Sequence, residues 1–488
     1  EVVQQEVVQP SPDSPAPEPG ETADKDQFAA QVAELRRLQT SWQAPLKGGN
    51  ATGFFQPSSE RLAALQPVAP QEETTRKLLS RQLHLKDLEV LTFLRNPGIQ
   101  AAAARMRGTL QSYSQVSNLD EILRQYSAFT EELMTGIGPM KGESVQTAFP
   151  FPGVLALKGQ IVNQEVKAAA ERLEIARRQA ITAARQTFWN LLFNLRAQAI
   201  TRKMTQLLRH LEAVATSRYE TGDTSFQDMI RVRINRETTE EELTTLKERQ
   251  RTLEAKLREL LDLPPAAELA APASPPALPP VPELTTLYEL ARTHRQEINM
   301  GEAQVGKLAR MIEMAETMIL PDFTLNLSLY EDEAVRKVGT AAHRDSFPTA
   351  TTASRGAGLP KSPWYGTNDA YLNQTRQALR AAREELAQTE ATVLFQVREA
   401  WSDLDQARRE LALYAESVVN LSQTALDVAT RGYETGKVAF ADVIDSYTTW
   451  LNTNLARARK NSDLGVAYSE LERAVGTTLS TERQRPPS

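Results

Sequence analysis

The sequence predicts a mainly α-helical protein made of two tandem repeats of a very long antiparallel helical hairpin. One short motif occurs twice, as Arg218-Tyr-Glu-Thr-Gly222 and as Arg431-Gly-Tyr-Glu-Thr-Gly436. A stretch without Gly or Pro precedes each copy, over residues 160–221 and 367–431, and a Pro-rich segment separates the two halves. Such self-similarity indicates two copies of one structural unit. Little β-structure is expected.

The two copies align with a constant offset of 214 residues (433 minus 219). The matching residues continue past the turn: Tyr219 with Tyr433, Gly222 with Gly436, Phe226 with Phe440, Asp228 with Asp442 and Ile230 with Ile444. A helix of about 60 residues would be a rod roughly 95 Å long. A Gly in the left-handed conformation then ends each rod, and a second helix returns at once.

Start and stop signals place the other helices. Short helices are expected over residues 26–42 and 72–93, ahead of the first repeat. Asn96 can cap the next helix and Pro97 occupies its first turn. This helix is expected to run to about residue 117. The corresponding helix of the second repeat is expected over residues 294–319. The returning helices of the two hairpins are expected over residues 225–261 and 440–475.

These signals divide the chain into six parts. The expected parts are a Pro-rich disordered arm (1–25), an N-terminal extension (26–84), the first repeat (85–263), a Pro-rich linker (264–284), the second repeat (285–480) and a C-terminal tail (481–488). The density of Pro in the linker favours an extended, polyproline-like chain that crosses from one hairpin to the next.

Composition excludes several classes of function. The net charge of −6 and the pI near 5.6 argue against nucleic acid as a partner, because no basic stripe would neutralise phosphates. The chain has no Cys, which excludes disulfides, a thiol nucleophile and a Cys-ligated metal. Its four His are scattered, and no phosphate-binding loop or nucleophile motif occurs. We therefore expect no catalytic residue, no metal and no cofactor.

No run of about 18 apolar residues is present, so a membrane-spanning helix is not expected. The chain begins at Glu1 without Met, and we expect that a signal peptide has been removed.

Apolar positions repeat in a heptad-like manner along the first rod, and many of them are alanines, such as Ala169, Ala176 and Ala183. Small residues allow close helix contact. One apolar seam per neighbouring helix is typical of helices that lie side by side in a curved layer around a lumen. A coiled-coil hairpin without a lumen is the alternative that periodicity leaves open.

Several motifs, taken in order, resemble one family. They are the Asn96-Pro-Gly-Ile99 helix start, the Phe149-Pro-Phe-Pro-Gly153 segment before the first rod, the Leu320-Pro-Asp-Phe-Thr324 stretch and the two Tyr-x-x-Gly tips. With the tandem hairpins, they resemble the TolC family of outer-membrane efflux channels over most of the chain. The resemblance implies a homotrimer whose long helices form a hollow α-barrel tunnel in the periplasm, usually topped by a β-barrel in the outer membrane.

The resemblance also implies partners and a location. A periplasmic adaptor (membrane fusion) protein would dock onto the hairpin tips, and an inner-membrane pump would complete a tripartite efflux or type I secretion system. The expected location is the cell envelope of a Gram-negative bacterium, in the outer membrane or in the periplasm associated with it. We assign the tip turns and adaptor docking to Tyr219, Gly222, Tyr433 and Gly436, for which turn chemistry alone is the alternative.

The tips also carry a predicted gate. Asp442 and Asp445 are three residues apart and share a helix face. Aspartates matching these two narrow the tunnel in the family, so three-fold symmetry would give a ring of carboxylates and a cation-selective constriction. Asp228 and Arg231 occupy the same places in the first repeat and belong to the same predicted ring. The family also joins its two tips by a Tyr-to-Asp hydrogen bond, which here would run from Tyr433 to Asp228.

The tip aspartates have a second interpretation. Asp228 and Asp442 fall in the first turn of a returning helix, where the helix dipole favours a carboxylate whatever the function. Ser225, three residues before Asp228, also resembles a capping pair.

The chain departs from the family where barrel strands should lie. Residues 116–147 have a helical pattern with Asn118 as its cap, and residues 322–330 are the only alternating segment of the second repeat. We therefore expect a membrane barrel that is reduced or absent, which makes another outer-membrane component a candidate partner. An export conduit is the first functional hypothesis, and a barrel-less scaffolding homologue in the periplasm that no longer conducts substrate is the alternative. An adaptor protein is a weaker third, because we find no lipoyl-like β segments.

Overall fold

A computed structural model describes residues 30, 33–43, 53–117, 145–146, 153–221, 225–273, 277–319, 352–353, 368–435 and 437–479. The chain divides into two compact units. The first contains residues 1–48, 107–168 and 302–384, and the second contains residues 49–106, 169–301 and 385–488. The second unit therefore holds both hairpin tips and the Pro-rich linker.

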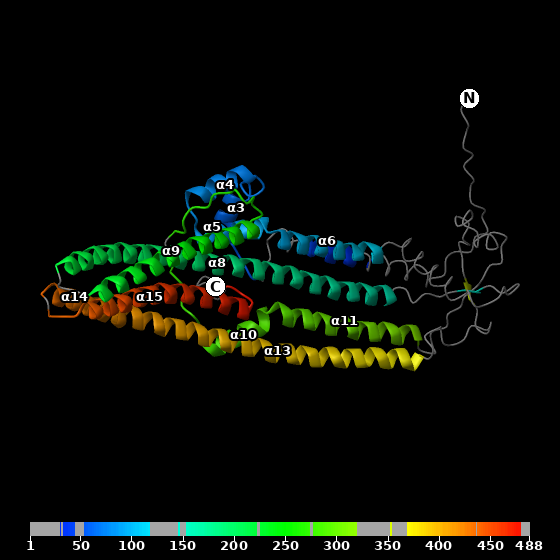
Figure 1. Ribbon diagram of the computed structural model, residues 1–488. Helices are drawn as coiled ribbons and strands as arrows, with labels where there is room; N and C mark the ends of the chain where they lie inside the picture. Colours follow the sequence, from blue (N-terminus) through cyan, green and yellow to red (C-terminus); the bar gives the residue numbers. More distant parts are fainter. Residues whose placement is uncertain are drawn as a thin grey trace, which may run out of the picture. The chain divides into compact units, whose positions relative to one another are not determined.

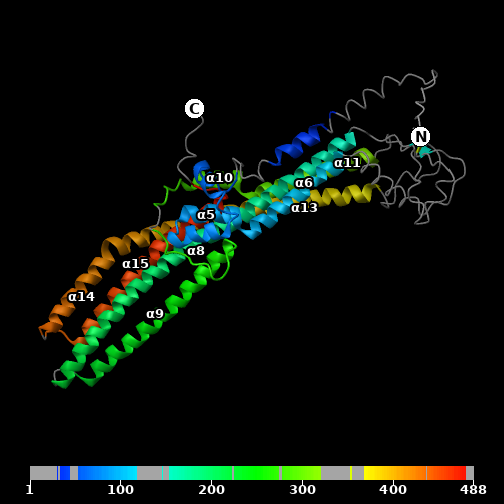
Figure 2. The same ribbon diagram turned by 90° about the horizontal axis from the view of Figure 1, so that it is seen from above.

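The long hairpins that the sequence predicts are present. In the first repeat, α8 (Gly153–Glu220) is one helix of 68 residues and α9 (Phe226–Leu260) returns beside it. In the second repeat, α13 (Asn368–Leu413) and α14 (Val419–Glu434) lead to the tip, and α15 (Phe440–Val475) returns. Within the second unit, Figure 2 shows a layer of helices in the order α14, α15, α8 and α9. The predicted mainly α fold of two tandem hairpins is confirmed.

The second rod differs from the prediction in one place, because a π-helical turn (Tyr414–Val418) separates α13 from α14. Buried residues before this turn are spaced four and three apart, and those after it follow the same spacing one residue late: Val393, Val397, Ala400, Leu404 and Ala407 before, and Ser422, Leu426, Ala429 and Tyr433 after. Ala407 and Ser422 are 15 residues apart (422 minus 407), one more than two heptads. The wider turn absorbs the extra residue and keeps both halves of the rod facing the core.

The N-terminal extension packs onto the first hairpin through α3 (Ser59–Leu65) and α4 (Glu72–Arg81). Figure 1 shows them clustered with α5 (Leu85–Arg95), the first helix of the first repeat, on one side of α8 and α9. A hydrophobic cluster joins these elements; its members include Leu65, Leu79 and Leu83 of the extension, Leu88 of α5, and Phe188, Leu191 and Leu257 of the hairpin. The extension is thereby fixed to the rod by an apolar core, and not only by its connection in sequence.

The single helix expected over residues 72–93 breaks into α4 and α5. Gln82 has an extended backbone, and Leu83 forms a parallel bridge with Pro272 of the linker. Ala270 N–H donates to the Leu79 carbonyl at 2.8 Å, and Ala273 N–H donates to the Leu83 carbonyl at 2.9 Å. The Pro-rich linker is thus held against the extension by strand-like pairing, which a helical pattern in residues 72–93 could not predict.

Each repeat has a sharp bend between a short helix and the next long one. The bend in the first repeat lies between α5 and α6 (Pro97–Ser117), and the bend in the second lies between α10 (Leu284–His294) and α11 (Gln296–Ile319). The Asn96 side chain accepts from Ile99 N–H at 3.2 Å, so the predicted helix cap is confirmed.

In the first unit, residues 33–41 are helical and contribute to a small core. Leu35 is buried with Leu110, Tyr113, Val162 and Val166. Two short strands, β1 (Val145–Gln146) and β2 (Thr352–Ala353), pair in the antiparallel sense in this unit. No helix in the described ranges is both long and apolar enough to cross a membrane.

Several expectations fall outside the described residues. These are the Pro-rich arm, the helix beginning at Asn118, most of the two segments in which barrel strands were sought, Gly222, Gly436 and the C-terminal tail.

Candidate functional site

The first hairpin tip is closed by a helix cap and an aromatic pair. Ser225 is the N-cap of α9, and its hydroxyl oxygen accepts from Asp228 N–H at 3.2 Å. The same hydroxyl donates to the Asp228 carboxylate at 2.8 Å. The rings of Tyr219 and Phe226 lie 5.7 Å apart across the turn, and both side chains are exposed. The capping interpretation of Ser225 and Asp228 is therefore confirmed.

The second tip is built differently, although its sequence is similar. Lys437 N–H donates to the Gly432 carbonyl at 2.8 Å, and Val438 N–H donates to the same oxygen at 3.2 Å. A Cβ added to Gly432 would overlap Cγ2 of Val438. The N-cap of α15 is Ala439, which has no side chain able to cap the helix. Backbone hydrogen bonds and the close contact at the glycine stabilise the second turn, whereas a serine hydroxyl stabilises the first turn.

The four predicted gate residues lie near the start of the two returning helices, with Asp228 and Asp442 in the first turns and Arg231 and Asp445 one turn further on. Asp442 and Asp445 are exposed on α15, Arg231 is exposed on α9, and Asp228 is half-buried beside its cap. Asp442 therefore also satisfies the helix-dipole interpretation, since it is the acidic residue in the first turn of α15. The structure places a carboxylate of each repeat directly after its turn.

The two tip tyrosines are not equivalent in burial. Tyr219 is 44% exposed, whereas Tyr433 is 8% exposed and belongs to a hydrophobic cluster behind the tips. This cluster draws residues from both hairpins: Leu208, Leu211 and Val232 from the first and Leu426, Val443 and Tyr447 from the second. The two tips are thus joined by an apolar core. The hydrogen bond expected from Tyr433 to Asp228 stays a prediction.

A polar network in the interior of the second unit was missed by sequence reasoning. Arg185 on α8 forms ion pairs with Glu89 on α5 and Glu472 on α15, and all three side chains are at most 12% exposed. Burial raises the pKa of Glu472, against the lowering effect of the Arg185 charge. An Arg on the apolar face of a long helix is the signal that could have revealed this network, because such a cation needs buried acidic partners.

A second buried cluster surrounds the bend before α11. Arg178 of α8 forms an ion pair with Glu297, and Arg295 forms another with Glu297 at 2.8 Å. Burial, together with the Arg178 charge, lowers the pKa of Arg295 to about 10. Burial alone would raise the pKa of Glu297, but the hydrogen bond and charge of Arg178 and the charge of Arg295 outweigh it, so this pKa is lowered. These groups join α8 to the start of the second repeat.

Apolar side chains remain exposed at the edges of the helix layer in the second unit. On α13, Phe395 is 65% exposed and Leu413 is also exposed; on α14, Leu421 is 67% exposed and Val428 is also exposed. On α9, Ile234 is 56% exposed. We name these two surfaces the α13/α14 edge and the α9 edge.

In the described part of the chain, no group of three or more His, Cys, Asp or Glu is placed to hold a metal.

Comparison with known proteins agrees with this architecture. Residues 287–477 match the family model described as outer membrane efflux protein. A search of curated proteins by sequence found no match.

Solved structures share the fold at low sequence identity. The outer membrane protein VceC from Vibrio cholerae is 15% identical with a TM-score of 0.59, and the match covers 81% of this chain and 97% of that one. A membrane protein from Pseudomonas aeruginosa is 17% identical with a TM-score of 0.62, and the match covers 81% and 90%. The CmeC outer membrane channel of Campylobacter jejuni is 14% identical with a TM-score of 0.59, and the match covers 80% and 85%.

These matches confirm the resemblance drawn from the sequence motifs. Identities this low establish a shared fold, whereas the family model identifies the second repeat from its sequence. The family is one of channels, and the absence of catalysis in this chain stays a prediction. The chain shares the fold of these outer-membrane proteins, and its residues 287–477 match the outer membrane efflux protein family model.

Proposed function

We propose that this chain is the channel subunit of a tripartite efflux or type I secretion system and that three copies form a periplasmic duct for export. The observation that carries the proposal is the pair of exposed apolar edges. The α13/α14 edge carries four large exposed apolar side chains, and the α9 edge carries Ile234. Exposed apolar surface of this kind on long helices favours a contact with another protein surface.

The order of the helices decides what kind of contact this is. In Figure 2, α14 and α9 lie at opposite ends of the layer. A contact between two copies through the same edge would therefore cover that edge in both copies and leave the other edge exposed. A head-to-tail contact between unlike edges covers both, and such a contact closes into a ring when the rotation between copies allows it. A closed ring of these layers is a tunnel.

The proposed duct places the tip residues at its periplasmic end. Asp442 and Asp445 would form the constriction, with Asp228 and Arg231 of the first repeat beside them. The Tyr219–Phe226 pair, which is exposed on the first tip, supports docking of a periplasmic adaptor there. Gly222, Tyr433 and Gly436 remain part of the proposed tip turns. Cargo would then pass without chemistry, with energy from an inner-membrane pump, in the envelope of a Gram-negative bacterium.

The proposed parts of the subunit keep the sequence boundaries. The repeats are residues 85–263 and 285–480, joined by the linker over 264–284 and preceded by the arm (1–25) and the extension (26–84). The tail over 481–488 follows the second repeat.

Single-channel conductance tests this function. The full-length chain would be reconstituted into planar bilayers, and cation selectivity would be measured for wild type and for the double variant Asp442→Asn, Asp445→Asn. We expect the double variant to lose most of its cation selectivity. The matched control is Asp427→Asn, since Asp427 is exposed on α14 away from the turn and bonds only to Gln423 among the described partners.

Two results would count against the proposal in different ways. A chain that assembles as a particle of three subunits by light scattering but never conducts would favour the scaffolding homologue. Conductance that is equally selective in the double variant would remove Asp442 and Asp445 from the constriction and leave the channel standing.

A further inference from the structure

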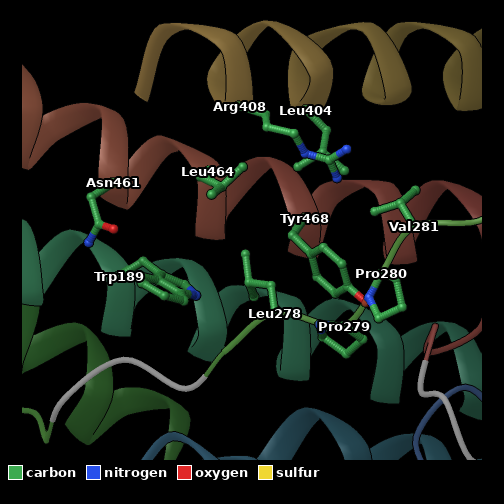
Figure 3. A pocket seen from close by; sticks show the side chains of 10 residues that line it. All are labelled: Trp189, Leu278, Pro279, Pro280, Val281, Leu404, Arg408, Asn461, Leu464 and Tyr468. Atoms are coloured by element: carbon green, nitrogen blue, oxygen red, sulfur yellow. The ribbon is translucent and has the colours of Figure 1, made fainter. Parts of the chain in front are cut away.

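The second unit contains a cavity that the proposed transport does not use. It has a volume of about 530 Å³ and lies between α8, α13, α15 and residues 277–283 of the linker, which we name the strap. Figure 3 shows Arg408 and Leu404 reaching toward it from α13, Leu464 and Tyr468 from α15, and Trp189 from α8. The size is within the range of about 300–1,000 Å³ that is typical of sites for small molecules.

Most of the side chains that line the cavity are apolar or aromatic, and several of them are held in place. Trp189 lies against Gly465, where an added Cβ would overlap the indole ring. The Tyr468 hydroxyl donates to the Leu479 carbonyl at 3.4 Å, which orients the ring. The strap forms one side of the cavity with Leu278, Pro279, Pro280 and Val281. Leu278 packs against the hydrophobic clusters of both repeats, and the ring of each Pro fixes its own φ, so the strap is held in place.

Arg408 on α13 is the cation in the cavity lining, and its side chain is exposed. Its neighbours on α13 are already paired, since Asp405 lies 3.0 Å from Arg409 and Glu410 lies 2.6 Å from Lys460. Within the described ranges, no carboxylate lies within ion-pairing distance of Arg408. A guanidinium beside aromatic and apolar walls is complementary to a carboxylate or sulfonate, which it can bind through two parallel hydrogen bonds.

We propose that this cavity binds an amphiphilic monoanion, with its acidic group on Arg408 and its apolar body between Trp189, Tyr468 and the strap. One unpaired cation suits a single negative charge. Asn461 adds a neutral polar group to the lining and can donate to a second oxygen of the same acid. The proposal does not depend on conduction, because the site is formed within one copy of the chain.

The test uses naphthalene-2-sulfonate as the probe and naphthalene-2-sulfonamide as its neutral counterpart. Binding to the full chain in a nonionic detergent would be measured by calorimetry, with quenching of Trp189 fluorescence as a second signal. Loss of one charge-assisted hydrogen-bonded pair corresponds to about a tenfold or larger loss of affinity. We therefore expect that loss in Arg408→Ala, partial recovery in Arg408→Lys and weak binding of the sulfonamide to wild type.

Arg409→Ala is the matched control, because Arg409 is the next residue, is exposed and lies outside the cavity lining. It should bind the sulfonate as wild type does. Trp189→Phe locates the probe, since it should remove most of the quenching signal. Equal affinity in wild type and Arg408→Ala, equal affinity for the sulfonamide, or unchanged quenching in Trp189→Phe would each overturn the proposal.

Discussion

Asn96 and Arg295 make the same contact in the two repeats, although they are different residue types. Asn96 Nδ2 donates to the Leu260 carbonyl at 3.0 Å, and Arg295 donates from its guanidinium to the Ala474 carbonyl at 2.9 Å. Leu260 and Ala474 are 214 residues apart (474 minus 260), the same offset as the tip tyrosines. Each bend before a long helix therefore caps the end of the returning helix of its own repeat, where carbonyl groups lack partners.

Removal of the Arg295 cap should destabilise the second repeat. Arg295→Ala leaves the carbonyls of Arg473 and Ala474 without this donor and removes one of the two cations beside Glu297. We expect a loss of about 3 kcal/mol in the free energy of unfolding, measured by denaturant titration. Arg292→Ala is the control, because Arg292 is exposed in α10, the helix that ends just before Arg295, and it should change stability by less than about 0.5 kcal/mol. Similar losses in both variants would contradict the capping role.

The lowered pKa of Glu297 predicts an acid-dependent stability. Its pKa lies below the ordinary value of 4.5 in the folded protein, so its ionised form stabilises the fold above that value. This contribution disappears as the pH falls through the lowered pKa. In Glu297→Gln the contribution is absent at every pH. The stability difference between wild type and variant should therefore be largest near neutral pH and shrink below pH 4.5. A difference that does not depend on pH would show that the carboxylate charge is not involved.

Gly432 should tolerate no side chain. Gly432→Ala places a Cβ against Val438, and overpacking of this kind costs about 1–3 kcal/mol. Val438→Ala in the same chain should recover most of that loss. Gly108→Ala provides the contrast, because nothing lies within 4 Å of an added Cβ in that helix, and this variant should gain up to about 1 kcal/mol. Thermal unfolding of these three variants and wild type tests both directions, and an unaffected Gly432→Ala would refute the steric account of this tip.

The two tips should respond oppositely to changes at their caps. Ser225→Ala removes the hydroxyl that bonds Asp228 N–H and should cost about 1 kcal/mol. Ala439→Ser adds a hydroxyl where α15 has no side-chain cap and should gain a similar amount. Proteolysis of the tips, compared between the two variants and wild type, reports the local effect. A neutral Ala439→Ser would show that the backbone at this N-cap does not accommodate the capping geometry.

A deletion inside the π-helical turn should be better tolerated than a deletion elsewhere in the rod. Removal of Glu416 would bring Ala407 and Ser422 to a separation of two heptads, so a regular helix would keep both buried faces in register. Removal of Ser402, which is also exposed, would turn Leu404 and Ala407 away from the core. Circular dichroism melting should show a small loss for the first deletion and a loss of several degrees for the second. Equal losses would contradict the register argument.

The sequence predicted the hairpins well because their signals are local. Long stretches free of Gly and Pro define α8 and α13, and a helix cap at Ser225 follows from the residue type and its spacing to Asp228. The break at residues 82–84 was missed because it depends on Pro272, which is far away in the sequence. The buried Arg185 network was missed for the same reason, since its partners come from α5 and α15.

The assignment of the tip residues had a mixed outcome for a related reason. Spacing alone placed Asp228 and Asp442 in the first turn of each returning helix, as observed. The unequal burial of Tyr219 and Tyr433 depends on which neighbours the folded chain brings to each tip. A matching residue type at a constant offset carries no information about those neighbours.

The extra residue in the second rod also bears on the ancestry of the two repeats. The rod of the first repeat, α8, is helical from Gly153 to Glu220 without a π-helical turn. If one ancestral hairpin gave rise to both halves, a single-codon insertion in the later history of the second copy accounts for the turn at Tyr414–Val418. A sequence alignment of the two halves then needs a one-residue gap at this turn, and an alignment without the gap underestimates their similarity.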